Sequence, residues 1–113
     1  MNLTELAKEV HKNAVAHGWW EEERSFGDII ALCHSELSEA LEAYRNGMPT
    51  NRTIYDHGIN GNKKPDGVPA ELADCIIRIL DYCGKEMIDI ESVVLEKHEY
   101  NKTRTYRHGG KVL

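Results

Sequence analysis

Apolar residues recur at helical spacing in four segments of the chain, and no segment shows the strict alternation of a half-buried strand. The predicted helices cover approximately residues 3–17, 25–46, 69–84 and 90–106. This pattern predicts an all-α protein with four helices in one domain that spans residues 1–113.

Local signals mark the ends of these helices. Asn2 and Ser25 are suitable N-caps, and an acidic residue follows each of them three positions later, as Asp28 follows Ser25. Pro69 suits the first position of the third helix, because its missing N–H group is not needed there. Gly84 is interpreted as the stop of that helix.

The connection between the second and third helices is long. Residues 47–68 are rich in Gly, Asn and Pro and have neither helical nor strand periodicity, so they are expected to form a loop. A loop of that length in a small domain is usually functional or mobile. The chain closes with a basic tail over about residues 107–113.

Composition indicates a globular protein. A chain of 113 residues with 41% hydrophobic and 29% charged residues has enough apolar surface for one core, which excludes disordered and fibrous classes. No apolar run approaches the roughly 20 residues that cross a bilayer, and no signal peptide is evident, so no membrane partner and a cytoplasmic location are expected.

Charge and cysteine usage narrow the function. A net charge of −5 argues against a nucleic-acid binder. The three cysteines lie among apolar helical residues without C-x-x-C spacing and are expected to be buried thiols. The charge is distributed unevenly along the chain, because residues 97–111 contain five cationic residues and only one acidic residue.

One carboxylate falls where an apolar residue is expected. Within HSELSEALEAYR, Glu36 lies inside the apolar arc of the second helix, and an unpaired carboxylate in that position is costly. It forms a pair with Glu39, and the third helix carries a second pair, Glu71 and Asp74. If the two helices pack antiparallel, the four carboxylates converge, and a hard cation such as Mg²⁺ or Mn²⁺ would relieve their repulsion.

The competing interpretation is that these acids form solvated helix faces, which is the commoner role of a single E-x-x-E. Two features favour the metal site instead. Glu36 lies in an apolar arc, and apolar residues surround most of the third helix, with Cys75, Ile77 and Tyr82 beside its acidic stripe. A helix that is apolar nearly all round is seldom on a monomer's surface, so helices are expected to pack across a dimer.

The fourth helix carries the complementary charge. Lys97, Asn101 and Arg104 continue the line of apolar residues that begins at Ile90, so an apolar stripe becomes polar and cationic towards the C-terminus. A phosphate chain would suit this end of the helix, because cations would hold the oxygens that a metal leaves free. For Arg104 alone, a solvated helix end is an equally good interpretation.

Three segments together resemble one family. ELSEALEAYR, KPDGVPAELADCIIRILDYC and EKHEYNKTRTYRHGGK are similar to the MazG-like, all-α nucleoside triphosphate pyrophosphohydrolases over about residues 19–111. The resemblance implies a MazG-like helical bundle completed by oligomerisation into a homodimer or homotetramer. It also implies Mg²⁺-dependent cleavage of a nucleoside triphosphate between its α- and β-phosphates, giving the monophosphate and pyrophosphate.

The resemblance also implies roles for individual residues. The metal ligands, through which catalysis would occur, would be Glu36, Glu39, Glu71 and Asp74. The substrate contacts would be Lys97, Asn101, Arg104 and Lys111. Trp19 would stack on the base, although a tryptophan pair beside a helix stop is at least as often a plug of the core. Many relatives have an additional acid where this chain has Ser35, so base and sugar preference do not follow from the resemblance.

Two other functions remain open. The chain would be a nucleotide-binding module with the same fold and no hydrolysis if it bound nucleotide tightly without releasing pyrophosphate. It would be a helical interaction module if its acidic stripes were surface and Mg²⁺ left its melting temperature unchanged. The phosphate-binding string G-x-x-x-x-G-K-[ST] does not occur.

Overall fold

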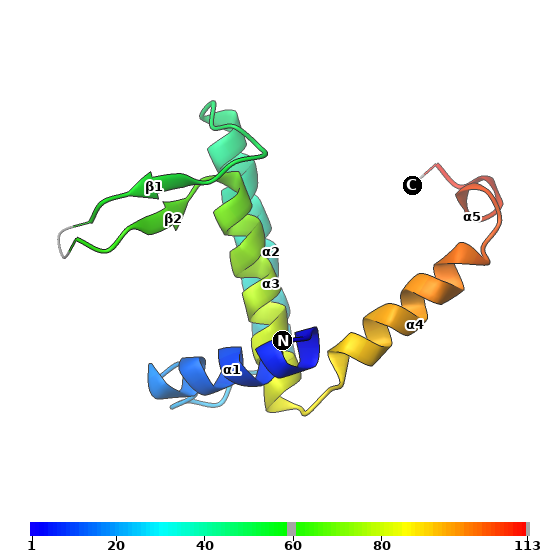
Figure 1. The fold of residues 1–113 in the computed structure, drawn as a ribbon, viewed down its shortest axis with the longest axis horizontal. Helices are drawn as coiled ribbons and strands as arrows, with labels where there is room; N and C mark the ends of the chain where they lie inside the picture. The colour runs from blue at the N-terminus through cyan, green and yellow to red at the C-terminus, as the bar shows by residue number, and fades with distance from the viewer. Residues whose placement is uncertain (59–60, 113) are drawn as a thin grey trace.

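The computed structural model describes residues 1–58 and 61–112 and is mostly helical, as predicted (Figure 1). Two short strands form a hairpin beside the helices. The elements in chain order are α1 (Leu3–Ala16), α2 (Phe26–Arg45), β1 (Ile54–Asp56), β2 (Lys64–Asp66), α3 (Val68–Lys85), α4 (Ile90–Lys102) and the short α5 (Arg107–Gly110).

The predicted starts of α1 and α2 are confirmed by their capping bonds. The side chain of Asn2 accepts a hydrogen bond of 2.9 Å from the backbone N–H of Glu5 at the start of α1. Ser25 and Asp28 form a reciprocal capping box at the start of α2, with bonds of 3.0 and 3.3 Å. Pro69 is the second residue of α3 and not the predicted first, because the helix begins at Val68 after Gly67, which makes no side-chain capping bond. The starts of α1 and α2 therefore follow from groups within three residues of one another, and that of α3 does not.

Gly84 does not stop α3, so this prediction is wrong. The helix continues through Gly84 to Lys85. A Cβ atom on Gly84 would lie 2.7 Å from the Cβ atom of His11 and would also meet the backbone of Ala7 on α1. The glycine is therefore needed where two helices approach closely. The left-handed residue that ends α3 is Met87, whose N–H bonds to the Gly84 carbonyl while the Ile88 N–H bonds to that of Cys83.

The fourth helix ends earlier than predicted, at Lys102 and not near Tyr106. The hydroxyl of Thr103 donates a hydrogen bond of 2.7 Å to the carbonyl of Tyr100, and the Thr103 N–H bonds to the same carbonyl. This local bonding satisfies the last turn and ends the helix. Part of the predicted basic tail then forms α5.

The segment between α2 and α3 contains regular structure that the sequence prediction missed. Strands β1 and β2 pair antiparallel, with Tyr55 opposite Pro65, and the hairpin extends away from the helices (Figure 1). Three residues per strand are too few for an alternating pattern to be recognised, and a proline argues against a strand unless it lies at an edge. Residues 59 and 60 of the predicted loop lie outside the described residues.

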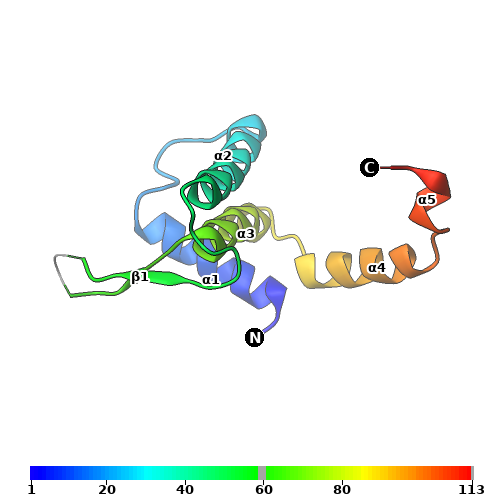
Figure 2. The same cartoon turned by 90° about the horizontal axis from the view of Figure 1, so that it is seen from above.

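Helices α2 and α3 run antiparallel side by side, and α1 crosses α3 (Figures 1 and 2). The junction of α1 and α3 is a small core of Ala7, Leu80 and Cys83, against which Val10, Ile88 and Ile90 pack. The cysteines are confirmed as buried free thiols. Burial raises the pKa of the Cys83 thiol, which keeps it protonated and unreactive at neutral pH.

Helix α4 projects away from the other helices (Figure 2). Its base is tied to α1, where the Leu3 N–H donates to Glu91 at 2.9 Å and the Thr4 hydroxyl donates to Asp89 at 2.6 Å. None of the residues of α4, all of which are described, is buried. The four predicted helices are thus present, but within one chain α4 does not pack with the other three into a bundle. In the described part of the chain, no helix combines the length and apolarity needed to span a membrane.

Candidate metal centre

Glu36 is buried, as its place in the apolar arc predicts, with 7% of its surface exposed. The Arg78 Nε atom on α3 donates a hydrogen bond of 2.9 Å to its Oε1 atom. The other oxygen, Oε2, is also buried and has no hydrogen-bond partner among the described residues. Oε2 is therefore satisfied only if a neighbouring carboxyl group such as Glu71 or Glu39 shares a proton with the Glu36 carboxylate, or if a cation binds there.

Three of the four predicted ligands come together. Glu36 on α2 and Glu71 and Asp74 on α3 each offer a carboxylate oxygen, and these atoms all lie within 4.8 Å of one another. The Oε2 atom of Glu71 is, like that of Glu36, buried without a partner within the described chain. The antiparallel packing of α2 and α3 creates this cluster, because it brings the two acidic pairs to the same level.

The fourth predicted ligand, Glu39, is exposed and lies outside that set of three. It is nevertheless close enough to Glu71 to raise the pKa of that residue. Its place one turn beyond Glu36 on α2 leaves it at the solvent side of the cluster.

The electrostatics of the cluster suit a cation. Burial, followed by the neighbouring Glu39 carboxyl group, raises the pKa of Glu71 to about 7. Burial and the charge of Glu36 also raise the pKa of Asp74. Burial opposes ionisation of Glu36 too, but the Arg78 hydrogen bond and neighbouring groups outweigh it and hold the pKa of Glu36 below its usual value. A hard divalent cation fits these oxygen donors and would replace the shared protons.

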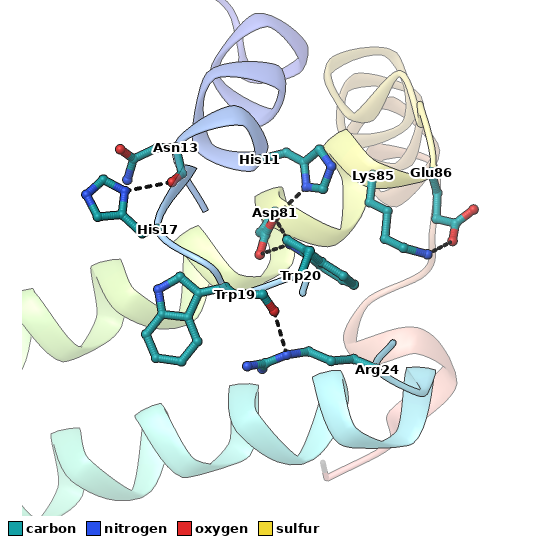
Figure 3. Close-up of polar contacts among 9 residues, drawn as sticks. All are labelled: His11, Asn13, His17, Trp19, Trp20, Arg24, Asp81, Lys85 and Glu86. Atoms are coloured by element: carbon teal, nitrogen blue, oxygen red, sulfur yellow. Dashed lines mark hydrogen bonds and ion pairs between the residues drawn. The ribbon is translucent and has the colours of Figure 1, made fainter. Parts of the chain in front are cut away.

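A cleft of about 470 Å³ adjoins the cluster. Its lining includes Glu36 and Asp74 together with Trp19, Arg24 and residues of α1. Trp19, the predicted base contact, is 56% exposed. The guanidinium group of Arg24 lies 5.3 Å from its ring centre, and Arg24 Nε donates 3.0 Å to the Trp19 carbonyl (Figure 3). The carboxylates and an aromatic face therefore share one cleft.

The other predicted substrate contacts are not brought to this cleft within one chain. They are all exposed, and they lie on α4 or beyond it, on the part of the chain that extends away from α2 and α3 (Figures 1 and 2). These residues are Lys97, Asn101, Arg104 and Lys111. The Lys97 ammonium group lies over the ring of Tyr100, 5.2 Å from its centre.

Asp81 continues the acidic stripe of α3 but has a different environment. It accepts hydrogen bonds from the Trp20 indole N–H at 3.0 and 3.1 Å and interacts with His11 Nδ1 at 2.8 Å (Figure 3). Lys85 lies over the Trp20 ring, 5.3 Å from its centre. Asp81 thus joins α1, α3 and the segment after α1, and it also lines the cleft.

Sequence reasoning did not single out Arg78. The available signal was its place one turn after Asp74 on the same face of α3, where a cation would meet the acidic stripe. Its partner on α2 is 42 positions away in the sequence, so the contact itself carried no local signal. Arg24 was missed in the same way, because it reaches the cleft from an irregular segment.

Comparison of the chain with protein-family models, with curated proteins and with solved structures finds no match. The description of the site therefore rests on its geometry alone, which consists of the carboxylate cluster, its two unpaired buried oxygens and the adjoining cleft.

Proposed function

We propose that this protein is a Mg²⁺-dependent nucleoside triphosphate pyrophosphohydrolase. The observation that carries the proposal is the convergence of Glu36, Glu71 and Asp74, with two of their oxygens buried and unpaired within the described chain. Carboxyl groups packed in this way must share protons when no cation is bound, and a divalent cation would take the place of those protons. The resemblance of the sequence to the MazG-like enzymes supplies the reaction.

The residues of the cluster would hold Mg²⁺, or Mn²⁺ in its place, with Glu39 on the solvent side. When bound, such an ion neutralises phosphate oxygens and lowers the pKa of a coordinated water. In the proposed reaction, water adds to one phosphorus, the bond between the α- and β-phosphates breaks, and pyrophosphate leaves with the nucleoside monophosphate as the other product. The ring of Trp19, exposed in the same cleft, would stack on the base.

The remaining phosphate contacts would come from a second copy of the chain. Lys97, Asn101 and Arg104 are exposed on α4, which has no buried residue of its own in the described structure. Self-association into a dimer or tetramer would give α4 a packing partner and would set its cations against the carboxylates of a neighbouring copy. The same arrangement would bring Lys111 towards the phosphates bound at the neighbouring copy.

Exposed apolar stripes support this assembly. On α2, three large residues at spacings of four and three are exposed: Leu37, Leu41 and Tyr44. On α3, three more at the same spacings are exposed: Leu72, Ile76 and Ile79. Stripes of this kind favour packing against another helix. The proposed partner is a second copy of the same chain, because homo-oligomers are the commonest assemblies of soluble proteins.

The direct test measures the products formed from a panel of ribo- and deoxyribonucleoside triphosphates. Monophosphate and pyrophosphate are expected in equal amounts with Mg²⁺, and neither with excess chelator. The substitution Glu71→Gln should abolish turnover, because it removes a ligand oxygen from the cluster. Glu42→Gln is the matched control, since Glu42 is exposed on α2 and outside the cluster. Tight nucleotide binding without pyrophosphate would contradict the enzyme and favour a binding module.

A further inference from the structure

Arg78 links the two helices that carry the carboxylates. It lies on α3, one turn after Asp74, and its side chain reaches across to Glu36 on α2, where Nε donates at 2.9 Å. Side-chain exposure is 32% for Arg78 and 9% for Glu36, so the ion pair is largely shielded from water. Arg78 also lines the cleft.

This contact gives the two carboxylate oxygens of Glu36 different environments. Oε1 is engaged by Arg78, whereas Oε2 is buried and has no hydrogen-bond partner in the described part of the chain. The terminal torsion of a glutamate side chain is soft, so an untethered carboxylate would rotate and exchange its oxygens. Hydrogen bonding of one oxygen restricts that rotation and leaves the other in a defined direction.

We propose that Arg78 is a positioning residue, whose Nε hydrogen bond to Oε1 orients Glu36 so that Oε2 is presented to the cation beside Glu71 and Asp74. The inference rests on the metal site of the proposed function and adds a residue to it. Partners of metal ligands commonly act in this way, and their substitution typically weakens metal binding by about 10- to 100-fold.

A purely electrostatic role for Arg78 makes the opposite prediction. If Arg78 served only as a counter-charge for Glu36, its removal would leave the cluster more negative, and a divalent cation would bind as tightly as before or more tightly. Replacement by lysine would then restore the original affinity, because lysine keeps the charge. A positioning role requires the planar Nε donor, which lysine does not have.

The experiment measures Mn²⁺ binding by electron paramagnetic resonance in the absence of nucleotide, with far-ultraviolet circular dichroism to confirm helical folding. Arg78→Met is expected to weaken Mn²⁺ binding by about 10- to 100-fold. Arg78→Lys is expected to weaken it by an intermediate factor. Lys64→Met is the matched control, because Lys64 is an exposed cation whose charge acts on Asp74. Its removal should leave Mn²⁺ affinity unchanged or slightly higher.

The outcomes separate this inference from the proposed function. If the unmodified protein binds Mn²⁺ and Arg78→Met binds it equally or more tightly, the positioning role is wrong and the metal site stands. If the unmodified protein binds no Mn²⁺, both are overturned. Should Arg78→Met fail to fold, Arg78→Lys decides the question, since affinity equal to that of the unmodified protein contradicts positioning and a loss supports it.

Discussion

The indole N–H of Trp20 lies between the two carboxylate oxygens of Asp81, at 3.0 Å from one and 3.1 Å from the other. The same carboxylate interacts with His11 on α1 at 2.8 Å. One aspartate on α3 therefore anchors both α1 and the segment that follows it. Because that segment also carries Trp19 and Arg24, the anchor sets the position of one wall of the cleft.

Trp20→Phe should destabilise the protein by about 1–3 kcal/mol, because the carboxylate of Asp81 loses a charge-assisted hydrogen bond in a half-buried site. The measurement is urea unfolding followed by circular dichroism. Trp19→Phe provides the control: Trp19 is 56% exposed, so its free energy of unfolding should change by less than about 0.5 kcal/mol. Equal losses in both variants would contradict the anchoring role of Trp20.

Gly84→Ala should also destabilise the protein, although alanine normally favours a helix. The new methyl group would lie 2.7 Å from the Cβ atom of His11 and against the backbone of Ala7, so α1 and α3 would have to separate. Overpacking costs about 1–3 kcal/mol, and the close contact with rigid backbone places Gly84→Ala towards the upper end, above the gain of about 1 kcal/mol in helix propensity.

Gly27→Ala is the control, because it makes the same substitution in a helix where the new methyl group meets no close contact. Gly27 lies in α2, and the nearest atom to an added Cβ would be the Ser25 hydroxyl at 3.7 Å, an ordinary contact. Alanine there should stabilise the protein by about 0.5–1 kcal/mol. The two melting temperatures should therefore move in opposite directions, and a stabilising Gly84→Ala would show that α1 and α3 do not meet as closely as described.

Stability should depend on pH through Glu71, whose pKa is raised from 4.5 to about 7 by burial and by the adjacent Glu39 carboxyl group. Between these two values the folded protein binds more protons than the unfolded chain. The free energy of unfolding contributed by Glu71 therefore falls as the pH rises through this window. Without metal, Glu71→Gln should become more stable relative to the unmodified protein as the pH rises from 5 to about 8.

Melting temperatures of both proteins across that pH range, in the presence of chelator, check this expectation. A difference that stays constant with pH would mean that Glu71 is ionised normally. Saturating Mg²⁺ should raise the melting temperature of the unmodified protein more at pH 8 than at pH 5, because the cation displaces the proton. Glu71→Gln should lose most of that gain.

Self-association should depend on the apolar stripes of α2 and α3. Leu41→Glu and Ile76→Glu, at positions that are 59% and 53% exposed, should convert the assembled protein to monomer, because each places a charge in the proposed contact. Sedimentation velocity gives the mass of the assembly directly. Glu42→Gln, beside Leu41 on α2, should leave it unchanged. A monomeric unmodified protein would contradict the assembly itself.

The sequence alone determined features that arise between residues a few positions apart. The caps at Asn2 and Ser25 follow from side chains that reach backbone groups three residues away, and the starts of α1 and α2 were predicted for that reason. The burial of Glu36 followed from its angular place on a single helix. The approach of Glu71 and Asp74 to Glu36 required one further assumption, that α2 and α3 pack antiparallel, and that assumption is confirmed.

Only the tertiary structure decided the contacts between distant segments. The Arg78 to Glu36 bond joins residues 42 positions apart, and the Trp20 to Asp81 bond joins residues 61 positions apart. Gly84 looked like a helix stop because the close approach of α1 cannot be read from α3 alone. Local bonding is encoded within a turn of chain, whereas these contacts depend on how whole helices cross, and helix crossing is set by packing over many residues at once.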